Sequence, residues 1–487
     1  MVKTIKDIYD KYNDYMEKNI RVNGWIRTVR KQKEMYFIEV NDGSCLRSIQ
    51  IVFNTSNIDK DKSSKLKTGV SVSILTLLTK SLIDKQPFEL VLVHNNDLKI
   101  LGSINDDSYP IAKSKLTLDY LRLNQHFRIR TNTFGAIARI RHQLAMATHQ
   151  FLGQNKKFIL VAPPQITCND CEGGGEAFQL TTLLKDKLKI DKDGKIDYSK
   201  DFFKSPAYLT VSGQLALETY CLALGGVYSY QSAFRADPSQ TSRHVAEFTM
   251  LEVEIPFANL SDNMDLAEEY FKYTIKYCLD NCKDDIDFLD KMYYQKRQDN
   301  QKFMPTLVEY LNKLISESFY RIPYTEVMKI LLKKQELGYK FETPIPTSGI
   351  FDFKSEHERY LTDQIFKKPV FVTHYPKDIK AFYMKLSDDK SEFGFDTVEC
   401  CDLLVPGIGE VLGGSCRTSD YDKLKSVMSN HGLLDSSLDY YLDLRKYGTV
   451  DHCGFGIGIS RLMMLITSME NIKDTIEYPR SMGSISY

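Results

Sequence analysis

Residues 227–257 contain the pattern that most restricts how this chain folds. Apolar and polar residues alternate in the two runs 228–234 and 246–257, which predicts two half-buried antiparallel strands. The loop between these runs, RADPSQTSRHV, is too long for a tight hairpin turn. We therefore expect a sheet in which a polar loop joins the ends of two neighbouring strands.

Charged residues are concentrated at the ends of these two predicted strands. They are Arg235, Arg243, His244, Glu247 and Glu252. Guanidinium groups match the geometry of phosphate and carboxylate groups, so the arginines and the histidine predict a pocket for a polyanion. Phe248 adds a flat apolar face to this pocket. On residue types alone, a surface hairpin with ordinary salt bridges remains the alternative.

The bulk composition indicates a globular chain of two or three domains. At 487 residues the chain is too long for one ordinary core, and its 43% hydrophobic and 26% charged residues give no sign of wholesale disorder. Lys+Arg and Asp+Glu number 64 each, so any nucleic-acid site has to be a local basic patch. The first twenty residues mix acids with bases and contain no long apolar run. We therefore expect neither a targeting peptide nor a membrane partner.

Cysteine usage indicates a reducing compartment. The ten cysteines have no regular spacing, and the chain is far larger than a disulfide-stapled secreted domain. Cys168 and Cys171 form a CxxC pair, but no second pair follows at the spacing of a zinc ribbon, so we expect no structural metal there. Together these observations predict a cytoplasmic protein.

The first 101 residues predict a small β-barrel after a short N-terminal extension. Five β-rich runs between residues 21 and 101 have the spacing of a five-stranded oligonucleotide-binding (OB) barrel. Basic residues, among them Arg27, Arg30 and Lys31, lie beside the run that contains Tyr36 and Phe37. A basic edge with exposed aromatic rings can bind unstacked bases. The alternation equally allows Phe37 to lie in the core of the barrel.

The remaining chain predicts a hinge and a larger domain. Residues 102–128 are polar and form the expected hinge, residues 129–487 form the second domain, and residues 262–345 are a mainly helical insertion within it. Apolar residues at helical spacing predict a helix over 134–151 that leads into a strand and then into Pro163 and Pro164. The charged residues Glu356 and Lys380 are candidates to line a site, but we favour the interpretation that they are solvated charges.

Three further acidic residues are candidates for chemistry. Asp402 and Glu410 are separated by a Pro-Gly loop, and two converging carboxylates beside nucleotide phosphates suit Mg²⁺; a surface turn is the alternative. Glu172 precedes three glycines that let the backbone approach a ligand closely, although a solvated loop acid would read the same way.

The wording FRADPSQTSRHVAEF closely resembles the second signature motif of the class II aminoacyl-tRNA synthetases, in the aspartyl, asparaginyl and lysyl subgroup. The bacterial-type asparaginyl enzymes are the most similar, and the resemblance extends along nearly the whole chain. It implies an α+β protein: a five-stranded OB barrel that binds the anticodon, followed by a catalytic domain with an antiparallel sheet flanked by helices. The helix, strand and proline of residues 134–164 resemble the first motif, which implies a homodimer; an internal core helix is the alternative.

The resemblance also implies roles for individual residues. Catalysis is implied for Arg235 and Arg461. ATP contacts are implied for Arg235, Asp237, Arg243, His244, Phe248, Glu410 and Arg461. Amino-acid contacts are implied for Glu172, Ser212, Gln214, Glu252 and Arg417. Anticodon contacts are implied for Arg30, Phe37 and Gln50. Asp402 and Glu410 are implied as ligands of Mg²⁺.

The implied activity is a two-step reaction that consumes ATP. The carboxylate of L-asparagine attacks the α-phosphate, pyrophosphate leaves, and a terminal ribose hydroxyl of tRNA(Asn) then accepts the aminoacyl group. The chain departs from the family pattern at Ser460, where an acid usually precedes the arginine of the third motif, and at Asp237, where glutamate is usual. A serine can cap the helix that starts near this position.

Two substitutions favour asparagine over aspartate as the substrate. The aspartyl enzymes have a lysine where this chain has Leu217, and an aspartate where it has Glu252. Loss of a cation and retention of a longer acceptor suit an amide NH₂ rather than a carboxylate. An aspartyl enzyme, including a non-discriminating one, and a non-catalytic RNA-binding relative are the alternatives.

Overall fold

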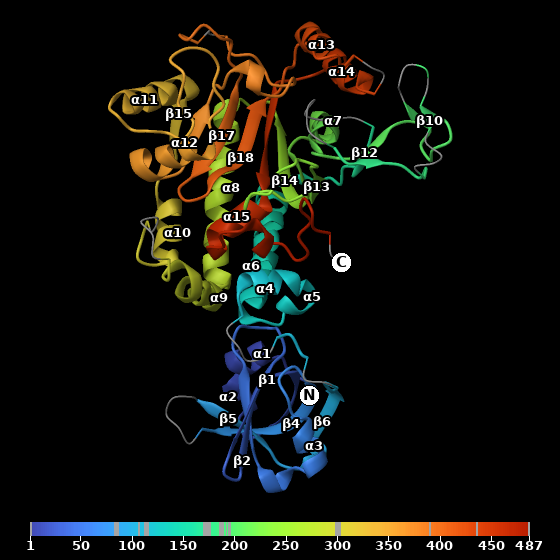
Figure 1. Cartoon of the computed structure of the whole chain (residues 1–487), viewed down its shortest axis with the longest axis vertical. Coiled ribbons are helices and arrows are strands. Elements are labelled where there is room, and N and C mark those ends of the chain that lie inside the picture. Colours follow the sequence, from blue (N-terminus) through green and yellow to red (C-terminus); the bar gives the residue numbers. More distant parts are fainter. Residues whose placement is uncertain are drawn as a thin grey trace. The chain divides into compact units, whose positions relative to one another are not determined.

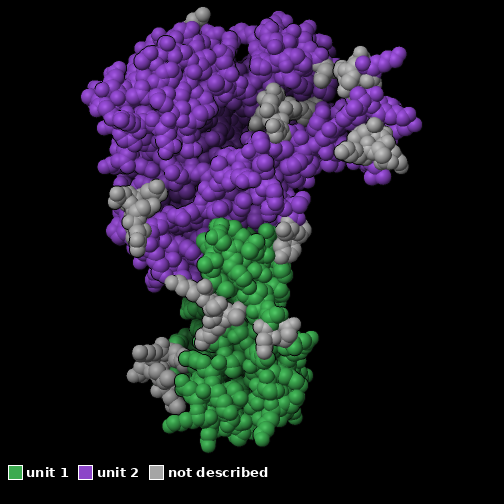
Figure 2. Space-filling view, viewed as in Figure 1, with its two compact units in different colours: residues 1–139 green, residues 140–487 purple. Residues whose placement is uncertain are grey.

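The computed structural model describes residues 2–81, 87–105, 108–111, 116–168, 177–184, 189–190, 192, 196–297, 303–388, 391–434 and 437–485. The chain forms two compact units, Met1–Arg139 and Ile140–Tyr487 (Figure 2). The division falls inside helix α6 (Asn132–His149). Residues 102–128 therefore belong to the first unit, and helices α4 (Leu118–Leu123) and α5 (Gln125–Arg128) form near their C-terminal end.

The first unit contains the predicted barrel (Figure 1). Its strands are β1 (Asn19–Gln32), β2 (Met35–Asn41), β3 (Ile49–Asn54), β4 (Ser71–Lys80) and β5 (Phe88–Leu92). They pair in the order β1-β2-β3-β5-β4, and pairing of β1 with β4 closes the barrel. Only the β3–β5 pair among them is parallel. The five strands match the five β-rich runs of the sequence, so the prediction of an OB barrel is confirmed.

Alternation of apolar residues along the strands fills the barrel. Val22 and Ile38 are fully buried, while their neighbours in sequence are partly or fully exposed. Helix α1 (Ile5–Asp10), capped by the Thr4 hydroxyl, adds Ile5 and Ile8 to this core. The unit also contains α2 (Tyr12–Tyr15), α3 (Lys60–Lys65) and β6 (Leu98–Gly102), which pairs with β4.

The second unit is built on an eight-stranded sheet in the order β15-β16-β17-β18-β19-β14-β13-β7 (Figure 1). The bounds of the strands are β7 Ile159–Leu160, β13 Val227–Phe234, β14 Glu247–Pro256, β15 Tyr320–Pro323, β16 Val370–Thr373, β17 Cys400–Val405, β18 Gly409–Cys416 and β19 His452–Gly458. The two edge pairs, β13–β7 and β15–β16, are parallel, and the others are antiparallel. The sheet is therefore mixed, with the predicted antiparallel pairing at its centre.

Helices pack on this sheet and hold its central strands. Helices α7 (Gln214–Leu224) and α15 (Ile459–Thr467) contact β14, and the long helix α8 (Leu260–Asn281) contacts β17, β18 and β19. The Asn263 amide on α8 donates a hydrogen bond of 3.0 Å to the Gly454 carbonyl of β19. The segment 262–345 is mainly helical, and its first helix covers the sheet while its strand β15 forms one edge.

The other elements surround this sheet. They are the small strands β8 (Ile166–Thr167), β9 (Gln179–Leu180), β10 (Lys189–Ile190), β11 (Ile196–Asp197) and β12 (Ala207–Leu209), and the helices α9 (Lys283–Leu289), α10 (Leu307–Ser316), α11 (Tyr324–Glu336), α12 (Ser355–Arg359), α13 (Tyr421–Asn430) and α14 (Asp439–Lys446). Among the helices of the described ranges, none has the length and apolar character needed to cross a membrane.

Candidate active site

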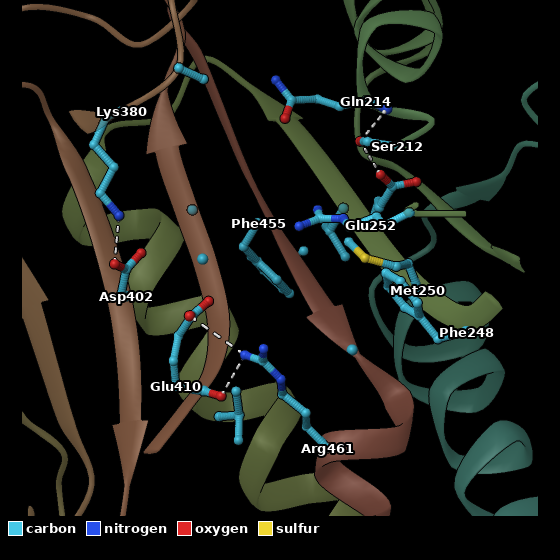
Figure 3. Close-up of a pocket in the computed structure, with 18 of the residues that line it drawn as sticks. Ser212, Gln214, Phe248, Met250, Glu252, Lys380, Asp402, Glu410, Phe455 and Arg461 are labelled. Atoms are coloured by element: carbon cyan, nitrogen blue, oxygen red, sulfur yellow. Dashed lines mark hydrogen bonds and ion pairs between the residues drawn. The ribbon is translucent and has the colours of Figure 1, made fainter. Parts of the chain in front are cut away.

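A cavity of about 670 Å³ lies on the large sheet of the second unit. Strands β14, β17, β18 and β19 supply its walls, together with the N-terminal ends of α7 and α15 (Figure 3). The predicted residues that line it are Ser212, Gln214, Arg235, Asp237, Arg243, His244, Phe248, Glu252, Asp402, Glu410, Arg417 and Arg461. Glu172, the remaining candidate for this site, lies outside the described residues.

Positive groups crowd together at one end of the cavity, which we call the nucleotide end. It contains Arg235, Arg243, His244, Phe248 and Arg461. Burial together with the nearby Arg359 lowers the pKa of Arg243 to about 10. Burial and the charge of Arg461 likewise lower the pKa of His244. Cations that disfavour one another in this way form a site for a polyanion.

Phe248 and Arg461 also line the nucleotide end. Phe248 follows the loop on β14, and the Arg235 guanidinium carbon lies 5.8 Å from the centre of its ring. Arg461 on α15 donates a hydrogen bond of 2.9 Å to the Glu410 carbonyl and lies 3.5 Å from the Glu410 carboxylate. Ser460 is the second residue of α15, whose N-cap is Gly458 without a side-chain hydrogen bond. Ser460 therefore lies inside the first turn of the helix and does not cap it.

The other end of the cavity, the amino-acid end, holds a fixed carboxylate. Glu252 accepts hydrogen bonds from the Ser212 hydroxyl, from the Gly213 amide at 3.0 Å and from the Ser229 hydroxyl at 2.9 Å. Glu252 is 5% exposed, and its carboxylate is directed towards the start of α7 (Figure 3). Leu217 is buried in a hydrophobic cluster with Val161, Cys221 and Val227.

Beneath Glu252 a network of buried charges holds Arg417. The Nε and Nη2 atoms of Arg417 donate to the two oxygens of Glu254 at 2.8 and 2.9 Å, and Nη1 donates to Ser415 at 2.6 Å. A guanidinium has five N–H donors, so two remain for a ligand. A side chain at position 454 would overlap the Glu254 carboxylate, which explains the glycine there.

Glu218 extends this network to Gln214. Its carboxylate accepts hydrogen bonds from Arg445 at 2.7 Å, from Tyr441 at 2.9 Å and from the Gln214 amide at 3.0 Å, and lies 3.0 Å from His452 Nε2. Burial opposes its charge, yet Arg445 and the neighbouring cations keep its pKa below the usual value. Glu218, Glu254 and His452 are close enough to hold a metal ion, but the two arginines already neutralise their charge.

Asp402 and Glu410, the predicted Mg²⁺ ligands, meet at a third place, which we call the metal corner. A Cβ atom on Gly413 would lie 3.4 Å from Asp402 Oδ1 and 3.9 Å from Glu410 Oε1, so the missing side chain leaves both carboxylates facing one space. Burial and the charge of Glu410 raise the pKa of Asp402. Lys380 Nζ donates to Asp402 at 2.5 Å (Figure 3). Lys380 therefore lines the site, which the sequence allowed, and the favoured interpretation as a solvated charge is wrong because Asp402 of β17 binds it.

The sequence interpretation missed several residues of this site. Glu254 could have been found from the period of two along β14, which also places Phe248 and Glu252 in the cavity. Glu218 could have been found four residues after Gln214 on the same face of α7. Glu358 carries no such signal. It contacts the Glu410 amide at 3.3 Å, and burial with the charge of Glu410 raises its pKa to about 7.

The predicted anticodon residues share the outer face of the barrel in the first unit. Arg30, Phe37 and Gln50 lie on the neighbouring strands β1, β2 and β3. Arg30 donates to Gln50 at 2.9 Å, and its guanidinium carbon lies 6.0 Å from the centre of the Phe37 ring. Phe37 is partly exposed and lies outside the barrel core, which answers the question that the alternation left open.

Known proteins match the chain from end to end. A family model described as "tRNA synthetases class II (D, K and N)" matches residues 118–482, and a model of the "OB-fold nucleic acid binding domain" matches residues 20–97. The asparagine–tRNA ligase of Desulfitobacterium hafniense is 44% identical over 483 residues, which cover 99% of both chains. The asparagine–tRNA ligase of Porphyromonas gingivalis is 43% identical over 468 residues, covering 96% of this chain and 95% of that one.

A solved structure agrees with these matches. The asparaginyl-tRNA synthetase of Pyrococcus horikoshii, complexed with asparaginyl-adenylate, is similar with a TM-score of 0.79 and 29% identity, over 97% of both chains. The chain belongs to the class II aminoacyl-tRNA synthetases, in the group of the aspartyl, lysyl and asparaginyl enzymes. Relatives that share more than two fifths of its residues over nearly the full length place it, within that group, among the asparaginyl-tRNA synthetases.

Proposed function

We propose that this chain is an asparagine–tRNA ligase, which activates L-asparagine with ATP and transfers it to the 3′ end of tRNA(Asn). The observation that carries the choice of amino acid is the amino-acid end of the cavity. There Glu252 is a fixed acceptor beside Arg417, and Leu217 lies in the core. An acceptor and a guanidinium suit the NH₂ and the oxygen of an amide, whereas a side-chain carboxylate would face Glu252 unpaired.

The first step joins the asparagine carboxylate to the α-phosphate and releases pyrophosphate. Arg235 stabilises the charge that develops on the α-phosphate, Arg243 and His244 hold the outer phosphates, and Phe248 and Arg461 enclose the adenine. Asp237 contacts the nucleotide from the loop. The crowding of cations at the nucleotide end supports these roles, because the phosphates supply the missing negative charge. Catalysis is then positioning and electrostatics, without a covalent nucleophile.

The amino acid is oriented by four side chains, those of Ser212, Gln214, Glu252 and Arg417. Glu172 contacts its ammonium group from the loop before the three glycines. The hydrogen bonds of the Ser212–Glu252 pair and of the Gln214–Glu218 pair support this proposal, since they fix the side chains before substrate binds. In the second step the ribose hydroxyl of tRNA attacks the activated carbonyl and releases AMP.

Asp402 and Glu410 would hold Mg²⁺ at the metal corner. The space that Gly413 leaves between the two carboxylates, and the raised pKa of Asp402, fit a hard cation with few protein ligands. When bound, the ion would neutralise phosphate charge. Lys380 balances Asp402 in this structure and would be displaced or shared.

On the barrel, Phe37 would stack on an anticodon base while Arg30 and Gln50 bind its edge and phosphate.

We further propose a homodimer. The apolar residues of helix α6 and its continuation, such as Leu144 and Phe151, are buried within one chain. The proposal instead rests on edge strand β7, where Ile159 and Leu160 are 44% and 53% exposed, and on Tyr220 and Leu224 of α7, also exposed. The nine free cysteines among the described residues favour a cytoplasmic location.

ATP–pyrophosphate exchange with asparagine and with aspartate tests the proposal. Exchange with asparagine alone is expected. Exchange with aspartate would overturn the specificity and favour an aspartyl or non-discriminating enzyme. Exchange with neither would favour the non-catalytic alternative. Light scattering coupled to gel filtration tests the dimer, which a monomer mass at micromolar concentration would contradict.

A further inference from the structure

Two acids of one helical segment hold the turn between β17 and β18. The segment comprises α12 (Ser355–Arg359) and the π-helical turn that follows it (Tyr360–Phe366). Asp363 accepts a hydrogen bond of 2.9 Å from the Gly407 amide, and Glu358 accepts one of 3.3 Å from the Glu410 amide. Since Glu410 is the first residue after this turn to face the cavity, the segment fixes where its carboxylate lies.

Glu358 also lies beside an arginine of the nucleotide end. A Cβ atom on Gly409, where φ is +85°, would meet Glu358 Oε2 at 2.7 Å and Arg243 Nη1 at 3.0 Å. Both charged groups thus border the space that a side chain at position 409 would occupy. The carboxylate of Glu358 therefore connects the backbone of the metal corner with the cation that we assign to the outer phosphates.

We propose that Glu358 is a positioning residue for the metal-bound nucleotide: it holds the Glu410 backbone through its carboxylate and balances the charge of Arg243. This inference rests on the proposed function and adds to it a residue that contacts neither the amino acid nor the adenine. Because Glu358 acts through Glu410, its loss weakens the binding of ATP with Mg²⁺ more than the binding of ATP alone. Partners of metal ligands contribute about 10–100-fold to metal affinity or activity.

The chain contains a matched control on the same helix. Glu356 is two residues away, and its carboxylate accepts the Glu342 amide at 2.7 Å and the Thr343 amide at 2.6 Å, away from the cavity. Glu356→Gln and Glu358→Gln remove the same charge from the same short helix. A general effect on the stability of α12 would appear in both variants.

The experiment is calorimetric titration of the full-length protein with ATP at pH 8, once with excess Mg²⁺ and once with EDTA. For Glu358→Gln we expect affinity to fall about tenfold with Mg²⁺ and to change less than about twofold with EDTA. For Glu356→Gln we expect both affinities to stay at the wild-type value. Glu358→Asp keeps the charge but shortens its reach to Glu410, so it should show the same Mg²⁺-dependent loss and decides the test if the glutamine variant does not fold.

Equal losses with and without Mg²⁺, or a Glu358→Gln protein that matches Glu356→Gln, would overturn the inference. Titration needs no turnover, so these outcomes are separate from the exchange assay. A wild-type protein that fails to exchange with asparagine contradicts the proposed function, whereas a wild-type protein that exchanges normally while the Glu358 variants bind ATP unchanged contradicts only this inference.

Discussion

The two ends of the catalytic cavity treat charge in opposite ways. At the amino-acid end the carboxylates have partners inside the protein: Glu254 pairs with Arg417, and Glu218 pairs with Arg445. At the nucleotide end the charges are mostly of one sign. Arg243 lies beside Glu358 but forms no ion pair within the described residues, and burial together with the neighbouring Arg359 lowers its pKa.

At the amino-acid end the charges are already neutralised by partners within the protein, whereas at the nucleotide end a bound ligand would have to neutralise them. Arg417 and Glu254 are only 3% and 1% exposed, so their pairing is part of the folded core. Buried pairs are costly to break, because the remaining partner is a buried charge. At the nucleotide end, we propose that the phosphates of ATP bring the compensating charge. We therefore expect changes at the first end to affect folding as well as specificity, and changes at the second end to affect mainly activation.

The largest effect is expected for Arg235→Ala. Removal of one preorganised group that stabilises transition-state charge lowers kcat by about 10²–10³-fold. Because the phosphates of ATP carry several negative charges close together, we expect the loss for this arginine to lie at the upper limit of that range. Exchange with asparagine should fall about 1,000-fold or more, while the thermal midpoint and tRNA affinity stay near the wild-type values. The assays are pyrophosphate exchange, differential scanning fluorimetry and filter binding of tRNA. Unchanged activation would refute the nucleotide assignment.

Glu254→Gln tests the amino-acid end of the cavity, where we expect the change to reduce the stability of the protein. The change leaves Arg417 buried without its bidentate partner, and loss of one member of a buried pair costs about 3–5 kcal/mol. We expect a thermal midpoint several degrees lower, together with reduced exchange. Glu247→Gln on the same strand β14 is the matched control, since Glu247 is only partly buried and outside the cavity. A Glu254→Gln protein as stable as this control would show that the amino-acid end is not part of the core.

The comparison also shows what the sequence could predict. The period of two along residues 246–257 placed Phe248 and Glu252 on one face, and the structure brings both into the cavity. No pattern in the sequence could distinguish Glu356 from Glu358. Residues two apart on a helix point in different directions, and only packing decides which of the two faces the turn between β17 and β18. The strand before Pro163 was predicted and is β7, but its parallel pairing was not, and the edge strand β15 escaped prediction because a strand of four residues is too short to show a period. Lys380 is a similar case, because its partner Asp402 lies on a distant segment.

A smaller effect is expected from the titration of His244. Burial and Arg461 lower its pKa in the free protein, and the phosphates of ATP should raise it. Binding then takes up a proton, so ATP affinity rises as the pH falls through the pKa of the complex and levels off below the pKa of the free protein. Each unit of difference between the two pKa values corresponds to about tenfold in affinity. Calorimetry in buffers of different ionisation enthalpy measures the uptake; His244→Asn should lose it while the background from ATP itself remains.

The smallest effect is expected for Ser460→Ala, which tests whether the departure from the family's acid matters at the nucleotide end. The Ser460 hydroxyl is buried and has no hydrogen-bond partner in the part of the chain that the structure describes. A buried hydroxyl without a partner costs about 1–3 kcal/mol, so its removal should raise the thermal midpoint slightly. Arg461 is held by Glu410 rather than by the preceding side chain, and the ATP concentration for half-maximal exchange should change less than about twofold. A large loss of ATP affinity would show that Ser460 has taken over the role of the missing acid in orienting Arg461. The nucleotide end would then be held in its binding geometry before ATP binds.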